Sequence, residues 1–234
     1  MQFIVETVRG VRRVEFVPRR MWNAGWAGRD QQAVRRHIEE LARLGVPAPE
    51  TVPAVFPVAT HLLLNATEVQ VVEPKTSAEV EYVLLVTPGE VWVTVGSDHS
   101  DRALEAHSVT KAKNACPNVV APRAWPLDEV VAHFDRVQLS CDVTRGGETV
   151  AYQRGTAGEL LPPSHWLEWL ARRGVPGEGG TQAAFFSGTI PALHGLEPGD
   201  AYEIRMRDPV LQREIVHAYR VEVVTADGRS NGRR

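Results

Sequence analysis

Three acidic residues near the middle of the chain have the types and the spacing of a divalent-metal site. Glu79 and Glu81 are one residue apart at the head of the apolar run EVEYVLLV, and Asp98 follows the next β-rich run. Alternate side chains of a strand point to one face, so the two glutamates lie roughly 7 Å apart along it. Buried carboxylates need a compensating cation or proton, and three oxygen ligands suit Mg²⁺ or Mn²⁺. The alternative is an edge strand whose glutamates face solvent and bind nothing.

A second pair of chemically capable residues lies upstream, in the segment RRHIEE. His37 and Glu40 are three residues apart, so on a helix they share one face and can interact. The same segment also has the composition of an ordinary solvated helix face, with arginines beside glutamates. Both interpretations stay open at this point.

Composition limits the classes of partner. The 234 residues are 43% hydrophobic and 24% charged, with a net charge of −3, as in an ordinary soluble domain. This charge gives no reason to expect nucleic acid or an anionic membrane as a partner, and no apolar stretch approaches a transmembrane helix. Cys116 and Cys141 are too few for a disulfide framework or a cysteine-rich zinc site. The N-terminal sequence lacks the apolar core of a signal peptide, so we expect a cytoplasmic protein.

Strands and hairpins must position the acidic residues. We expect a hairpin over 2–8 and 11–17, strands near 68–73, 79–86 and 90–96, a second hairpin over 137–144 and 148–153, and strands at 183–187, 201–207 and 214–224. Expected helices are 30–44, capped by Asp30 and ended by Gly45, then 100–113, 127–135 and 163–173. The proline-rich segment 45–57 reads as an extended connector without regular structure, and 174–180 as a loop. A mainly β fold with peripheral helices (α+β) fits this pattern.

Six short motifs, in order along residues 25–220, resemble those of the fumarylacetoacetate hydrolase superfamily. They are Gly28-Arg29-Asp30 with His37-Ile38-Glu39-Glu40, Glu79-Val80-Glu81, Ser97-Asp98-His99-Ser100-Asp101-Arg102, Lys113-Asn114-Ala115-Cys116-Pro117, Gln153-Arg154-Gly155-Thr156, and Gly188-Thr189-Ile190-Pro191-Ala192 with Pro198-Gly199-Asp200. The resemblance implies that family's mixed β-sandwich or β-roll fold. It also implies an N-terminal hairpin, lid helix and connector in 1–60, a catalytic domain in 61–225 and a flexible tail in 226–234.

The chain also departs from the family pattern. The interval between Glu81 and Asp98 is shorter than usual, as if a helical insert were missing. Ser97 replaces an asparagine, and Asp30 and Gln31 replace the asparagine and tyrosine of the lid motif. These departures point to a divergent branch, so the identity of the substrate does not carry over.

The resemblance assigns roles to the candidate site residues. It implies Mg²⁺ or Mn²⁺ on Glu79, Glu81 and Asp98, with open positions for a keto acid or diketone whose carbonyl the ion polarises as a Lewis acid. It makes His37 a general base and Glu40 its orienting partner.

Further residues would contact the substrate. Lys113 would donate to a substrate oxygen, with Lys111 as the competing candidate and surface lysines as the plain alternative. Arg102 would pair with a substrate carboxylate or merely with a neighbouring aspartate. Gly188 and Thr189 resemble a clamp for a carboxylate, although a tight turn also explains the glycine.

The remaining conspicuous side chains have simpler explanations. His99 points away from the side chain of Asp98 and is expected to be structural. Cys116 has no identifiable partner histidine and is expected to be inert. The tryptophans are expected to anchor the core or an interface.

The leading hypothesis is metal-dependent cleavage of a C–C bond in a small keto acid, either acylpyruvate-type hydrolysis or oxaloacetate-type decarboxylation. A working dyad of His37 and Glu40 favours hydrolysis, which needs an activated water. The alternatives are a hydratase, dehydratase or isomerase of an unsaturated acid on the same metal site, and a non-catalytic relative that binds a small acid. The resemblance also implies a homodimer.

Overall fold

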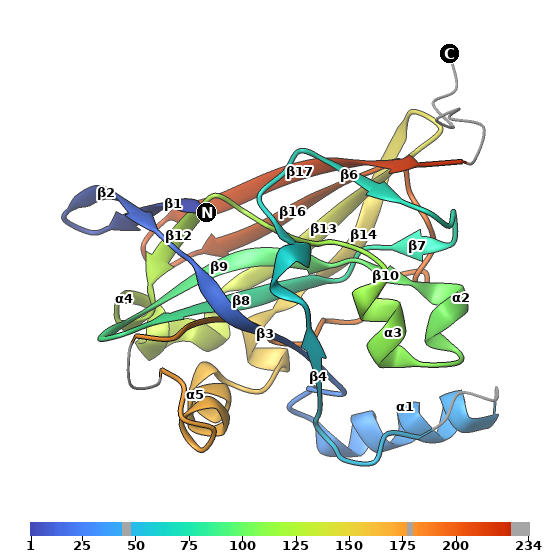
Figure 1. Cartoon of the computed structure of the whole chain (residues 1–234), viewed down its shortest axis with the longest axis horizontal. Coiled ribbons are helices and arrows are strands. Elements are labelled where there is room, and N and C mark those ends of the chain that lie inside the picture. Colours follow the sequence, from blue (N-terminus) through green and yellow to red (C-terminus); the bar gives the residue numbers. More distant parts are fainter. Residues whose placement is uncertain (44–47, 177–179, 226–234) are drawn as a thin grey trace.

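The computed structural model describes residues 1–43, 48–176 and 180–225; within α1 the side chains of His37, Glu40, Leu41 and Arg43 lie outside the described part. Over these ranges strands dominate, and they form two principal sheets that pack face to face, with helices at one side (Figure 1). The expected mainly β fold with peripheral helices is confirmed.

The larger sheet has ten strands in the described ranges and runs in the order β2-β1-β12-β9-β8-β15-β3-β4, with β11 attached to β9 and β5 to β11. Its strands are β1 (Gln2–Thr7), β2 (Gly10–Glu15), β3 (Pro18–Gly25), β4 (Ala54–Val58), β5 (Leu63–Leu64), β8 (Val80–Thr87), β9 (Glu90–Asp98), β11 (Asn118–Val120), β12 (Arg123–Pro126) and β15 (Gln182–Phe186).

The smaller sheet has five strands within the described residues, in the order β14-β13-β16-β17-β6. They are β6 (Glu68–Val71), β13 (Gln138–Arg145), β14 (Glu148–Thr156), β16 (Ala201–Asp208) and β17 (Arg213–Val223). A short ladder of β7 (Thr76–Ser77) with β10 (Ser100–Asp101) stands beside them. At the β13–β14 turn Gly146 and Gly147 both have positive φ, which glycine adopts without steric cost.

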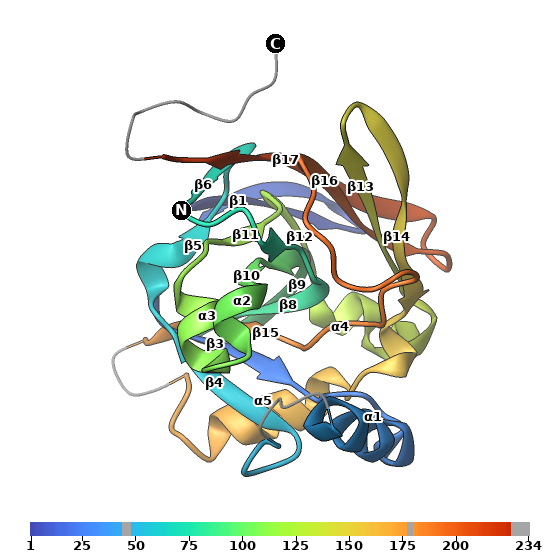
Figure 2. The same ribbon diagram turned by 90° about the vertical axis from the view of Figure 1, so that its right-hand side faces the viewer.

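Helices lie below and in front of the sheets (Figure 2). They are α1 (Gln31–Arg43), α2 (Arg102–Glu105), α3 (Val109–Asn114), α4 (Leu127–Val130) and α5 (Pro163–Ala171), with 3₁₀ turns at Thr60–Leu62, Val131–Arg136 and Ala157–Glu159. Asp30 caps α1, because its Oδ1 accepts hydrogen bonds from the backbone N–H groups of Gln32 and Ala33. No helix in the described ranges is long and apolar enough to cross a membrane.

Strand β8 is buried on both faces, which explains its almost unbroken apolar sequence. Tyr82 and Leu84 face a core cluster shared with the five-stranded sheet. Val83 and Leu85 face a second cluster, to which strands from both ends of the larger sheet contribute, so that sheet curls around it. Glu81 has the parity of Val83 and therefore lies at the end of this second face.

Two expectations were wrong. Segment 45–57 was expected to lack regular structure, but its end forms β4, which pairs with β3. Pro57 is tolerated there because β4 is an edge strand and needs fewer ladder hydrogen bonds. The helix expected over 100–113 is two helices, and Ser108 caps the second through a hydrogen bond from the N–H of Lys111.

The helix expected over 127–135 is α-helical only in α4 and continues as the 3₁₀ turn Val131–Arg136. The remaining expected elements are present within a few residues of their predicted bounds. Strand β3 was not expected at all, since its first residues are a proline and two arginines. Three predictions fall at least partly outside the described residues: the end of α1 at Gly45, the middle of the loop over 174–180 (residues 177–179), and the tail from residue 226.

Candidate metal centre

A tight hairpin brings the three acidic residues together. Strands β8 and β9 are joined by the two-residue turn Pro88-Gly89, and their register pairs Val80 with Ser97. The N–H of Asp98 donates to the backbone O of Glu79 at 3.0 Å, which places these two residues directly opposite each other. The short interval between Glu81 and Asp98 is therefore the length of one plain hairpin, and it still delivers the third carboxylate.

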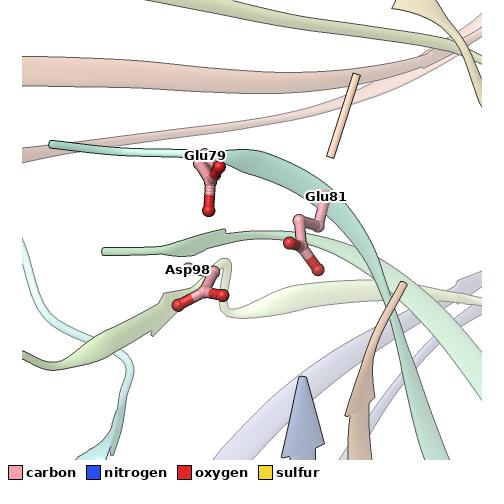
Figure 3. Close-up of side chains that lie close together, drawn as sticks. All are labelled: Glu79, Glu81 and Asp98. Carbon is pink, nitrogen blue, oxygen red and sulfur yellow. The ribbon is translucent and has the colours of Figure 1, made fainter. Parts of the chain in front are cut away.

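The carboxylates form one compact buried group. Each of Glu79, Glu81 and Asp98 offers an oxygen, and these three oxygens lie within 4.8 Å of one another. Asp98 is fully buried, Glu81 is 1% exposed and Glu79 is 9% exposed. Figure 3 shows the three carboxylates facing the same space from the adjoining ends of the two strands. Across the described residues no other cluster of histidine, cysteine or acidic side chains has metal-binding proximity.

Two cationic side chains border the group. Lys113 is buried and forms an ion pair with Asp98, and its Nζ lies 3.7 Å from Oε2 of Glu79. Arg102 places Nη2 3.6 Å from the same Glu79 oxygen. Helices α2 and α3 supply these cations, because both follow closely after β9 and fold back beside it.

The electrostatics of the group favour an added cation. Burial, together with the charge of Asp98, raises the pKa of Glu81 well above its usual range. Burial also raises the pKa of Glu79, although Arg102 and Lys113 oppose this rise. Burial lowers the pKa of Lys113, but the neighbouring carboxylates, Asp98 first, outweigh it and raise that pKa overall. The positive charges of Lys113 and Arg102 do not fully balance the three buried carboxylates, whose oxygen atoms are suitable ligands for a hard divalent cation.

Arg102 is held mainly by the protein. Its Nε donates to Oγ of Ser77 at 2.7 Å, and its Nη1 donates to Oε2 of Glu105 at 2.8 Å. Asp101, a candidate partner of Arg102 in the sequence, instead caps α2 by accepting from the N–H groups of Ala103 and Leu104. The guanidinium therefore braces Glu79, and a substrate carboxylate would have to compete with Glu105 for it.

Gly188 and Thr189 meet the carboxylates from another side. The N–H of Gly188 donates to Oε2 of Glu81 at 2.8 Å. The hydroxyl of Thr189 donates to the backbone O of Val80 at 2.8 Å and accepts from Nε2 of Gln153. Both groups thus already bond to the protein, and they fix Glu81 and the start of β8. Gly188 has φ +85°, and a Cβ there would come within 2.7 Å of Cβ of Ala27, so glycine is required twice over.

A cavity of about 1170 Å³ opens beside the carboxylates. Glu79, Glu81, Arg102 and Lys113 line one part of it, together with Thr189. Helix α1 borders another part through Ala33 and Val34, together with its capping residue Asp30. The side chains of His37 and Glu40, further along this helix, lie outside the described residues.

His99 and Cys116 stand apart from this cavity. Both ring nitrogens of His99 have hydroxyl partners, Tyr219 at 3.1 Å and Thr76 at 2.8 Å. Burial lowers the pKa of His99 to about 3, so the ring is neutral. Burial raises the pKa of the Cys116 thiol to about 12, which makes it a poor nucleophile.

Sequence reasoning missed several residues that shape the site. Gln153 is fully buried and bridges strands, since its Oε1 accepts from the N–H of Val80 while its Nε2 donates to the backbone O of Ile190. Its place in the Gln153-Arg154-Gly155-Thr156 motif was a usable signal. Ser77 and Glu105 carried no signal, because no local pattern reveals that they hold Arg102.

Comparison with protein families gives one match. The model of a family described as "Protein of unknown function (DUF2848)" matches residues 24–219. No curated protein sequence matches the chain.

Solved structures are similar in fold. The 2-keto-3-deoxy-D-arabinonate dehydratase complexed with magnesium and 2,5-dioxopentanoate has a TM-score of 0.61 at 15% identity, covering 92% of this chain and 78% of its own. The 4-oxalocrotonate decarboxylase from Pseudomonas putida G7, complexed with calcium and acetate, has a TM-score of 0.52 at 17% identity, covering 88% and 78%. Cg1458 with inhibitor has a TM-score of 0.60 at 16% identity, covering 92% and 81%. These are structures of the fumarylacetoacetate hydrolase superfamily, so the expected fold is confirmed.

Proposed function

Because the chain belongs to the DUF2848 family and has the fumarylacetoacetate hydrolase fold, we propose that it is a divalent-metal-dependent enzyme that cleaves a C–C bond in a small keto or diketo acid. The observation that carries this proposal is the buried group of Glu79, Glu81 and Asp98, whose oxygens lie within 4.8 Å of one another at the edge of a cavity.

Glu79, Glu81 and Asp98 would hold Mg²⁺ or Mn²⁺, since all three offer carboxylate oxygens and buried carboxylates favour a hard cation. When bound, such an ion supplies Lewis-acid polarisation of a keto oxygen. The magnesium and calcium in two of the structural relatives support a hard cation, and the carboxylate set supports it independently.

Lys113 would stabilise negative charge on the substrate. Its pKa is raised by the surrounding carboxylates, so the ammonium keeps its proton at neutral pH and acts as a hydrogen-bond donor rather than as a base. Because Lys113 also pairs with Asp98, a substrate oxygen next to the carboxylates would lie within its reach.

His37 and Glu40 are proposed as the water-activating dyad of a hydrolase. Position 37 follows Ala33 by four residues and Val34 by three, and both of these line the cavity, so helical periodicity supports this placement. Without the dyad, decarboxylation remains the better proposal, because that reaction needs no activated water.

The test is a turnover screen of acylpyruvates and oxaloacetate with Mg²⁺ or Mn²⁺, alongside the metal content of protein purified without chelator. We expect turnover that stops on chelation and returns with the ion, and an ion-free Glu81→Ala variant. Retained hydrolysis in His37→Ala would remove the dyad and leave the metal site standing. Protein that takes up neither ion at millimolar concentration would refute the enzyme proposal and favour a non-catalytic binder of small acids.

A dehydratase is the second candidate, and the likeness to a dehydratase structure favours it. Product analysis separates the reactions: hydrolysis releases pyruvate and an acid, decarboxylation releases CO₂, and dehydration keeps the carbon skeleton. We also propose a homodimer, as the family resemblance implies, which light scattering would test.

A further inference from the structure

The cavity extends well beyond the carboxylates. Its volume of about 1170 Å³ exceeds the range of roughly 300–1,000 Å³ that holds drug-sized ligands. A three- or four-carbon keto acid bound at the carboxylates would leave most of this space empty. The remainder therefore leaves room for a substituent larger than the reacting end of the substrate.

The walls of this remaining space are mostly apolar. They come from separate segments of the chain: the end of β3 and the start of α1, strand β4, helix α3, residues 158–160 and residues 190–196. The apolar lining side chains include those of Trp26, Val34, Phe56, Val109, Ile190 and Leu196.

Two aromatic rings, Phe56 and Trp26, form a continuous wall that starts at the charged end. Nζ of Lys113 lies 5.9 Å from the centroid of the Phe56 ring. The Trp26 ring lies 6.0 Å from that of Phe56, centroid to centroid. A substituent that leaves a keto acid bound near Lys113 would therefore meet Phe56 first and Trp26 next. We refer to these two residues as the aromatic wall.

The backbone around the aromatic wall is arranged to hold it. Trp26 has φ +53°, a left-handed conformation that bulky residues rarely adopt and that persists only where the surroundings enforce it. Gly25 leaves room for the neighbouring ring, since a Cβ there would lie 3.0 Å from Cε2 of Phe56. Trp26 is also only partly buried, so this strained placement serves the cavity surface rather than the core.

The charges around the cavity disfavour a second carboxylate on the substrate. Arg29 pairs with Asp135 at 2.6 Å, Arg102 with Glu105, and Lys113 with Asp98. Every cationic side chain among the described lining residues thus already has a carboxylate partner. Asp30, Glu105 and Glu159 also line the cavity and would repel a further anion.

From these contacts we infer that the aromatic wall is the subsite for an apolar alkyl or aryl substituent of the keto acid, and that the chain selects such substrates over dicarboxylic or polyhydroxylated ones. This inference rests on the proposed function, because it assumes that the keto acid end binds at the carboxylates.

Binding measurements test the subsite independently of turnover. The Mg²⁺-loaded protein is titrated by calorimetry with oxalate, which tests the carboxylate end alone, and with straight-chain 2-oxo acids from pyruvate to 2-oxooctanoate. Burial of each added methylene should tighten binding about fourfold until the aromatic wall is covered. Phe56→Ala should flatten this series and weaken 2-oxooctanoate by about tenfold or more, with oxalate affinity unchanged.

Two further variants guard against misfolding. Trp26→Gly removes the indole while it relieves the left-handed backbone, so it should fold and still lose part of the chain-length dependence. Trp169→Ala is the matched control, since Trp169 packs on Trp22 and Phe185 away from the cavity, and it should keep the full dependence.

The outcomes separate the two proposals. Oxalate binding with no gain along the series would overturn the subsite and leave the proposed function intact. Tighter binding of 2-oxoglutarate than of 2-oxopentanoate would also overturn it. If neither oxalate nor any 2-oxo acid binds in the presence of Mg²⁺, the proposed function fails first and the subsite with it.

Discussion

Replacement of Glu81 by glutamine should abolish metal-dependent stabilisation without harming the fold. Glu81→Gln keeps the shape of the side chain and can still accept the hydrogen bond from the N–H of Gly188. It removes one of the three carboxylates whose oxygens lie within 4.8 Å. The variant therefore tests the charge of the site rather than its packing.

The magnitude follows from linkage. An ion present at about 100 times its dissociation constant stabilises the folded state by about 2.7 kcal/mol. In a chain of this size each kcal/mol moves the melting temperature by about 2–4 °C, so Mg²⁺ should raise that of the wild type by about 5–11 °C. The variant should shift by less than about a quarter of this, because the two remaining carboxylates are already paired with Lys113 and Arg102.

Without metal, Glu81→Gln should be at least as stable as the wild type. Burial raises the pKa of Glu81 well above its usual range, so ionised Glu81 lowers the stability of the metal-free fold at neutral pH. The unfolded chain ionises first as the pH rises, and this loss therefore grows above about pH 4.5. Glu81→Gln removes the loss, and we expect its metal-free melting temperature to equal or exceed that of the wild type.

Thermal unfolding followed by circular dichroism, in chelator and then in millimolar Mg²⁺, Mn²⁺ or Ca²⁺, measures both effects. Glu148→Gln, at the exposed end of the β13–β14 hairpin, is the matched control and should behave as wild type. An equal Mg²⁺ shift in wild type and Glu81→Gln would place the ion elsewhere. No shift in the wild type with any of the three ions would refute the electrostatic reasoning altogether.

Three other outcomes are expected. Lys113→Met leaves a buried carboxylate unpaired and should lower the free energy of unfolding in chelator by about 3–5 kcal/mol, as measured by urea denaturation. The control Lys111→Met changes an exposed lysine and should cost about 0.5 kcal/mol or less. Equal losses in the two variants would contradict the buried ion pair. Gly188→Ala should lower the free energy of unfolding by about 1–3 kcal/mol more than Gly89→Ala does. Both glycines have positive φ, but only a Cβ at Gly188 would meet another atom within 4 Å. Equal melting temperatures for the two variants would refute that clash. Burial lowers the pKa of His217, so the unfolded chain binds a proton there before the folded chain does as the pH falls. The melting temperature should therefore decrease as the pH drops below about 6.5, and His217→Gln should make this decrease smaller. An unchanged decrease would rule out His217 as its source.

The sequence was most informative where local pattern and burial agree. The run from Glu79 to Val86 predicts a buried strand with two carboxylates on one face, and β8, with Glu79 directly before it, is buried along its length. Asp98 was grouped with them from its place after the next β-rich run, and in the structure a two-residue turn fixes the register that brings it there.

Long-range contacts limited the rest. Strand β4 was hidden by its prolines, which only an edge position makes acceptable, and no local feature marks that position. The aromatic wall joins residues 30 positions apart, and Trp26 was assigned simply to the core or an interface. The glycines on either side of the Trp26-Ala27 pair were the available signal, since Gly25 and Gly28 both allow close approach of neighbouring side chains.

The β8–β9 hairpin also predicts which length changes this protein family can accumulate. Insertions at the Pro88-Gly89 turn lengthen the loop far from the carboxylates and leave the ladder between Glu81 and Gly96 unchanged. A single residue added to or removed from one arm would instead reverse the alternation of faces and turn Asp98 towards the opposite core. Related sequences should therefore vary freely in length at the turn. Within the two strands, length should change only by two residues in one strand or by equal numbers of residues in both. The short interval between Glu81 and Asp98 in this chain then corresponds to the shortest form of a hairpin that tolerates insertions at its turn.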